Sequence, residues 1–100
     1  MSFDVNALGG MFGGLMAKIQ QAADVAQLEG TAGGGMVKVT VNGKQEILSV
    51  SISDGVMDDR EMLEDLICVA TNDALRRSKE FMAEQMKQMT GGLPIPPGLF

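Results

Sequence analysis

The sequence contains no histidine, no tryptophan and no tyrosine, and it has a single cysteine. A lone Cys68 excludes an intramolecular disulfide bond and a cysteine-rich metal site. Its neighbours in the chain are apolar, so we expect Cys68 to pack as a small hydrophobic residue. Because the chain has no histidine and no pattern that pairs a nucleophile with a base, we expect no enzyme activity, no cofactor, no metal ion and no small-molecule substrate.

Signals for export and for membrane insertion are also missing. The N-terminus, Met1-Ser2-Phe3-Asp4, has no basic segment, and glycines interrupt the apolar residues that follow it. No apolar run approaches the length needed to span a bilayer. We therefore expect a cytoplasmic protein that does not bind membranes.

Aromatic residues are scarce, since four phenylalanines are the only ones. The chain is nevertheless 45% hydrophobic and contains nine methionines, which suits one small domain with a thin core. We expect a single domain over residues 1–100, with a loose glycine-rich N-terminus at 1–14 and a Pro/Gly-rich tail at 91–100. Small chains of this kind often complete their core by oligomerisation.

A heptad-like spacing of apolar residues predicts a long helix in the first third of the chain. The residues with this spacing are Leu8, Phe12, Leu15, Ile19, Ala22 and Ala26. Gly30 is expected to end the helix, and the glycine-rich segment 30–35 is expected to be a flexible linker. This segment lacks the Gly-Lys-Ser/Thr ending of a phosphate-binding loop.

Alternation of apolar and polar residues predicts a strand over residues 36–41. Its inward-facing residues are Val37, Val39 and Val41. The following pair, Asn42-Gly43, is a strong signal for a β-hairpin turn. We therefore expect a second strand to return antiparallel to the first.

The return strand is expected over residues 44–52, with Leu48, Val50 and Ile52 facing inward. Ile47 directly before Leu48 breaks the alternation. This predicts either a β-bulge or a split into two short strands, so the sheet has two or three strands.

A second long helix is predicted after Asp58, which is expected to be its N-cap, with Glu61 completing a capping box. Two apolar stripes follow its length at helical spacing. The core-facing stripe consists of Leu63, Ile67, Ala70 and Ala74, and a rotated stripe consists of Leu75, Met82, Met86 and Met89. We expect these stripes to contribute to the core or to a dimer contact.

The predicted order is long helix, small antiparallel sheet, long helix, which is an α+β fold. A sheet of two or three strands leaves exposed edges, and the apolar stripes of the helices need partners. A twofold homodimer would meet both requirements.

Arg76-Arg77-Ser78-Lys79 is the densest basic cluster in a chain whose formal net charge is -5. It follows an acidic stretch of the second helix, so this part of the helix could meet phosphate. The same residues could instead form surface ion pairs, because Asp73 precedes Arg76 and Arg77 by three and four residues. The spacing alone leaves both interpretations open.

Several blocks of sequence together are specific for one family. They are Met36-Val37-Lys38-Val39-Thr40-Val41-Asn42-Gly43, Met62-Leu63-Glu64-Asp65-Leu66, Thr71-Asn72-Asp73-Ala74-Leu75-Arg76-Arg77 and the Pro97-Gly98 tail. With these blocks the chain resembles the YbaB/EbfC family of bacterial nucleoid-associated proteins, from about Leu8 to the C-terminus. The resemblance implies a tweezer-like homodimer whose helical arms grip duplex DNA with low sequence specificity. It also implies a role in nucleoid organisation and gene regulation, without catalysis.

The cations expected to contact DNA are Arg76, Arg77, Lys79 and Lys87 on the second helix and Lys18 on the first. Family members commonly carry several lysines in the first helix, whereas this chain has only Lys18 there. An alternative is therefore a dimeric protein-interaction module with little or no DNA affinity. No aromatic residue is placed to stack on bases, and no array of side chains suits the reading of base edges.

Overall fold

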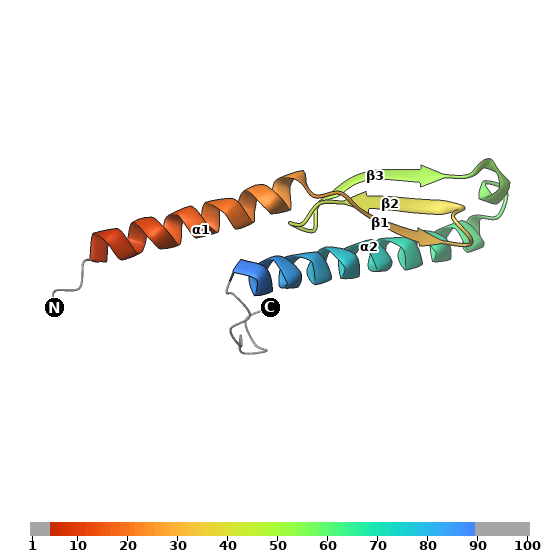
Figure 1. Cartoon of the computed structure of the whole chain (residues 1–100). Helices are drawn as coiled ribbons and strands as arrows, with labels where there is room; N and C mark the ends of the chain where they lie inside the picture. Colours follow the sequence, from red (N-terminus) through yellow and green to blue (C-terminus); the bar gives the residue numbers. More distant parts are fainter. Residues whose placement is uncertain (1–4, 90–100) are drawn as a thin grey trace.

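Two long helices and a three-stranded sheet make up the described chain (Figure 1). The computed structural model describes the backbone of residues 5–89, and it describes solvent exposure for Gly10 and for residues 13–88. The elements are α1 (Val5–Val25), β1 (Leu28–Ala32), β2 (Val37–Val41), β3 (Ile47–Ile52), the short 3-10 helix η1 (Asp54–Val56) and α2 (Arg60–Met89). The predicted α+β class is confirmed. The expected tail at 91–100 lies outside the described residues.

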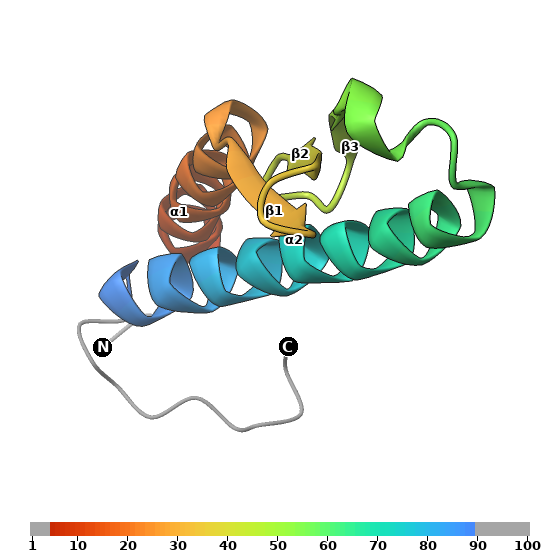
Figure 2. The ribbon, with the colours of Figure 1, turned by 90° about the vertical axis from the view of Figure 1, so that its right-hand side faces the viewer.

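The sheet is antiparallel with strand order β1-β2-β3, and α2 packs along one of its faces beneath β1 and β2 (Figure 2). The core lies between this face and the helix, because alternate residues of each strand point toward α2. Its buried members are Ala32, Val37, Val39, Val41, Val56, Ala70 and Ala74. Three residues expected in the core, Leu63, Ile67 and Leu75, are only partly buried and pack at its margin.

Strand β1 is an additional strand that the sequence did not predict. It lies where the end of a helix and a flexible linker were expected. That prediction is wrong, since α1 ends at Val25 and Gly30 pairs with Val39 in the sheet. A Cβ atom added to Gly30 would lie 2.3 Å from the Ala70 carbonyl oxygen and 2.3 Å from the Ala74 backbone nitrogen. Glycine is therefore required here because β1 crosses α2 at backbone contact distance.

Helix α1 begins earlier than the sequence predicted. Residues 5–14, expected to be loose, are helical, and residues 1–4 lie outside the described chain. Glycine lowers helix stability by about 1 kcal/mol per residue relative to alanine, but it breaks a helix less strongly than proline does. No proline occurs in this segment, which is consistent with a continuous helix.

The connection from β2 to β3 is a five-residue loop over residues 42–46 rather than the predicted two-residue turn. The Asn42 side-chain oxygen accepts hydrogen bonds from the backbone N–H groups of Lys44 and Glu46. The Asn42 N–H donates to the Glu46 carbonyl, at 3.1 Å, which closes the loop. Gln45 adopts a left-handed backbone conformation within it, with φ of 63°.

The irregularity predicted in the return strand is a β-bulge. Thr40 pairs with Ser49, whereas the next residue, Val41, pairs with Ile47. Leu48 is therefore the extra residue, and β3 continues as one strand instead of splitting.

Two predictions about α2 are wrong, one about its N-cap and one about Cys68. The N-cap is Asp59 rather than Asp58, since the Asp59 carboxylate accepts a hydrogen bond from the Met62 N–H at 3.1 Å. The turn after η1 shifts the start of α2 to Arg60 and so moves the cap by one residue. Cys68 is exposed rather than packed, because its side of the helix points away from the sheet.

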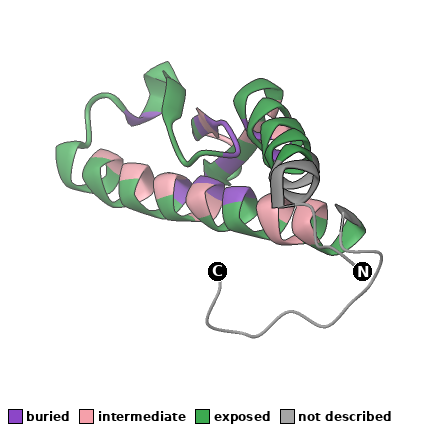
Figure 3. Cartoon of the chain, turned by 90° about the vertical axis from the view of Figure 1, so that its left-hand side faces the viewer, coloured by how far each residue is buried: buried purple, intermediate pink, exposed green. Residues whose placement is uncertain are grey.

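Strand β3 carries apolar side chains that α2 does not cover. Val50 and Ile52 pair with buried residues of β2 and share their face of the sheet, as does Ile47. These three side chains are nevertheless 49%, 36% and 53% exposed, in that order. The expected inward-facing Leu48 is also exposed. Figure 3 shows the resulting exposed strand beside the partly buried face of α2.

Helix α1 contacts the remainder of the protein at its C-terminal end, where Ile19 and Ala23 are buried. The Gly43 N–H donates to the Ala23 carbonyl at 2.8 Å, and Lys44 Nζ lies 2.7 Å from Asp24 Oδ1. The Asp24 carboxylate, which accepts this hydrogen bond, raises the pKa of Lys44. The loop at 42–46 thus fastens the end of α1.

The molecule is elongated. Its principal dimensions are 70 × 23 × 16 Å, and its radius of gyration is 18.5 Å. A compact domain of this length has a radius of gyration of about 13 Å. In Figure 1, α1 and the C-terminal half of α2 extend beyond the same end of the sheet, and we call them the two arms.

Candidate nucleic-acid interface

The rotation of α2 about its axis places its basic residues in solvent. Ser78 is fully buried and donates a hydrogen bond from Oγ to the Asn42 carbonyl at 2.8 Å. Successive helix residues are separated by about 100°, so Arg76 and Lys79 point away from the buried side. Arg76, Arg77 and Lys79 are all exposed. The cluster predicted from sequence is therefore a solvated surface around one buried serine.

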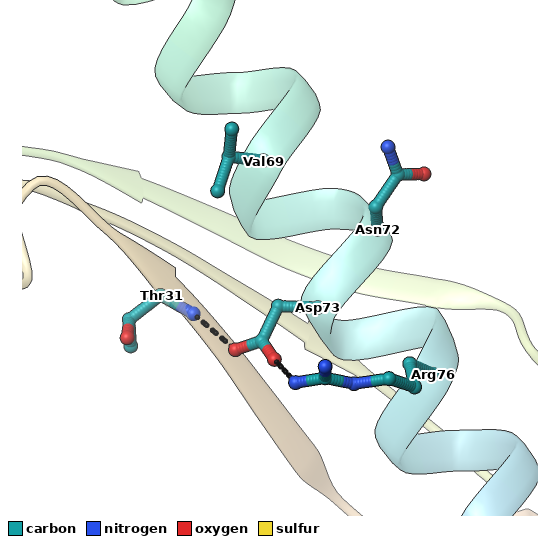
Figure 4. Close-up of a pocket in the computed structure, with 5 residues that line it drawn as sticks. All are labelled: Thr31, Val69, Asn72, Asp73 and Arg76. Carbon is teal, nitrogen blue, oxygen red and sulfur yellow. Dashed lines mark hydrogen bonds and ion pairs between the residues drawn. The ribbon is translucent and has the colours of Figure 1, made fainter.

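Asp73 binds both arginines, and Figure 4 shows its bonds to Arg76 and to Thr31. Its Oδ1 lies 2.5 Å from Arg76 Nη2, and its Oδ2 lies 3.3 Å from Arg77 Nε. The backbone N–H of Thr31, on the outer edge of β1, donates to the same Oδ2 at 3.2 Å. This backbone hydrogen bond, supported by the two guanidinium groups and opposed by partial desolvation, lowers the pKa of Asp73.

The ion pairs foreseen from the sequence spacing are present, and they partly neutralise the cluster. Glu80 adds a longer contact to Arg76, at 3.9 Å. The side chains of Arg76 and Arg77 remain 66% and 52% exposed. Each guanidinium has five N–H donors, so bonds to Asp73 leave donors directed at solvent. Both arginines can therefore bind an external anion while they stay paired.

Arg76 lies between two hollows in the surface. The larger, about 530 Å³, is lined by Thr31, Val69, Asn72, Asp73 and Arg76 (Figure 4). The smaller, about 310 Å³, is lined by Gln45, Asn72, Leu75, Arg76 and Lys79. The structure thus brings Arg76 and Lys79 to one hollow. Within residues 13–88, Lys79 forms no ion pair.

The other predicted cations lie farther along the arms. Lys87 is exposed in the last turn of α2, and Lys18 is exposed on α1. A further exposed cation is Lys38 on β2, which is not among the cations that the sequence predicts to contact DNA. Lys38 pairs with Thr31 and Ser51 on the face of the sheet opposite α2. The alternation of β2 predicts that Lys38 faces away from the valines, but it does not mark this lysine as a DNA contact.

Gln45 was also missed, because no sequence pattern shows which loop residue will lie beside a helix.

No group of three or more acidic, histidine or cysteine side chains able to hold a metal ion occurs in the part of the chain that was described. In the same part, neither helix is long and apolar enough to cross a membrane.

These features define a class of protein: a small α+β protein in which one long helix lies across a three-stranded sheet and displays a basic cluster beside it. The sequence profile of the YbaB/EbfC DNA-binding family matches residues 12–93. The chain belongs to this family, as its sequence blocks predicted.

Curated relatives agree with this assignment. A nucleoid-associated protein of Syntrophobacter fumaroxidans is 50% identical over 91 residues, covering 85% of this chain and 83% of the relative. A nucleoid-associated protein of Desulforamulus reducens is 56% identical over 75 residues, covering 73% of this chain and 70% of the relative. An uncharacterized protein of Helicobacter pylori has a similar crystal structure, with a TM-score of 0.72, 28% identity and coverage of 90% of this chain and 100% of that one.

Proposed function

We propose that this chain is a nucleoid-associated protein that binds duplex DNA as a homodimer, without catalysing a reaction. The exposed cluster of Arg76, Arg77 and Lys79 on α2, in a chain of a DNA-binding family, is the observation that carries the proposal. The names of the relatives support it. The corresponding location is the nucleoid, in the cytoplasm, where the protein contributes to DNA organisation and gene regulation.

The proposed binding has low sequence specificity. Phosphate contacts fix a protein on DNA but carry no base information, and the cluster consists of cations suited to phosphate. The Asp73 carboxylate already binds one guanidinium nitrogen of each arginine, which limits the bidentate contact that arginine makes with guanine. Affinity therefore comes mainly from the release of counterions, and it falls with added salt.

A homodimer is supported by the edge strand β3. Its uncovered strip of Ile47, Val50 and Ile52 faces the same side as the core. Burial of such side chains against a second copy would remove apolar surface from water. The dimer would also double the number of cations, and the two arms of each protomer give it a tweezer-like outline.

Duplex binding can be tested by fluorescence anisotropy of a labelled duplex at low salt. We expect the wild-type protein to bind, and Arg76→Ala/Arg77→Ala to bind roughly tenfold more weakly or worse, because phosphate contacts are lost. Arg60→Ala is the control, since Arg60 pairs with Glu64 at the other end of α2. An equal loss in Arg60→Ala would place the contact elsewhere.

Two observations favour a second function. Asp73 neutralises part of the basic cluster, and α1 carries few cations. A dimeric protein-interaction module with little DNA affinity is consistent with both. Absence of duplex binding by the wild-type protein at the lowest salt would favour this alternative.

A further inference from the structure

Gln45 has an unusual backbone conformation for its residue type. Among the described residues it is the only non-glycine with positive φ, at 63°. Glycine adopts this conformation without steric cost, whereas a residue with a side chain rarely does. The loop itself is held by Asn42, whose side chain bonds to both neighbours of Gln45. The glutamine side chain is therefore not needed to form the loop.

The position of Gln45 suggests what its side chain does. It lines the hollow of about 310 Å³ beside the basic cluster, together with Asn72, Leu75, Arg76 and Lys79. The polar lining thus consists of two carboxamides and two cations, with no carboxylate. Asp73 lines the neighbouring hollow instead. Neither the Gln45 nor the Asn72 carboxamide has a hydrogen-bond partner within the described residues.

We infer that this hollow is a phosphodiester-binding subsite, in which the carboxamides of Gln45 and Asn72 donate hydrogen bonds to phosphate oxygens beside Arg76 and Lys79. The inference rests on the proposed DNA-binding function and deepens it. Asparagine and glutamine are frequent donors to backbone phosphates. Two adjacent cations provide the charge, and the carboxamides provide directional donors.

The decisive variant is Gln45→Gly, which removes the carboxamide and suits the left-handed backbone. We expect duplex affinity to fall roughly three- to tenfold at every salt concentration, as for the loss of one ordinary hydrogen bond at a solvent-exposed site. The salt slope should stay unchanged, because glutamine is neutral and displaces no counterion. Lys79→Ala, in contrast, should reduce the slope by about 1 for each protomer whose Lys79 contacts a phosphate.

Two controls separate contact from other effects. Gln45→Glu should weaken binding more than Gln27→Glu, which introduces the same charge at another exposed position. Thermal unfolding and light scattering should show that Gln45→Gly keeps its fold and oligomeric state. Wild-type affinity in Gln45→Gly would overturn the subsite and leave the proposed function standing.

Side-chain NH₂ signals in NMR spectra test the subsite independently of duplex binding. We expect the signals of Gln45 and Asn72 to shift when inorganic phosphate replaces chloride at equal ionic strength. A shift in a protein that binds no duplex would overturn the proposed function but support an anion site here. Unshifted signals would overturn the subsite.

Discussion

Asp73 is the residue on which the sheet, the helix and the basic cluster meet. It accepts a hydrogen bond from the edge of β1 and holds Arg76 and Arg77. Helical spacing, which is a local property, offered the two ion pairs as one of two interpretations of the basic cluster. The bond to Thr31 joins residues 42 positions apart, so no local pattern could have predicted it.

This arrangement predicts a pH-dependent contribution to stability. The lowered pKa of Asp73 means that its charged form is favoured by folding, so the contribution is present above the unfolded pKa of about 3.9. It is lost as the pH falls through the lower folded pKa. We expect the free energy of unfolding at pH 7 to be higher for the wild-type protein than for Asp73→Asn. This difference in free energy should shrink below about pH 4.

Urea unfolding of both proteins from pH 7 into the acid range measures this difference. Asp65→Asn is the control, because Asp65 is exposed on α2 and forms no bond within the described residues. A difference between wild type and Asp73→Asn that stays constant into the acid range would contradict the assignment.

At the scale of elements, the sequence predicted the two long helices and strands β2 and β3, and it missed β1. The inward-facing residues of β1 include Gly30 and Ala32, which are small because α2 lies so close. Small inward-facing residues remove the contrast on which alternation depends. The glycines therefore made this segment look like a flexible linker. Only the position of α2 shows that Gly30 packs against the helix backbone.

The edge strand β3 gives a prediction about assembly. Val50→Lys should convert the proposed dimer largely to monomer, because a charge would then stand in the apolar strip on the α2 side. Ser51→Lys is the matched control, since Ser51 is the next residue and faces the opposite side of the sheet. Light scattering measures the mass of each variant.

Two results would contradict the proposed dimer contact at β3. A monomeric wild-type protein would refute it outright. If instead both lysine variants remained dimers, the interface would lie away from β3, and the arms would be the next region to test.

At the scale of the whole molecule, the sequence predicted the basic cluster and the α+β class, but not how they combine. Charge along the chain identified Arg76, Arg77 and Lys79. The hollow beside them depends on the loop at 42–46, whose left-handed residue turns toward α2. The elongated shape likewise follows from tertiary contacts at the end of α1, which helical periodicity does not reveal.

The measurement that tests the central claim most directly is the salt dependence of duplex affinity. Five candidate cations per chain give ten in the proposed dimer. If about half reach phosphates, the logarithm of affinity should fall against the logarithm of salt concentration with a slope of roughly -4 to -5. A slope near zero, or no binding at the lowest salt, would contradict an electrostatic grip on DNA by these arms.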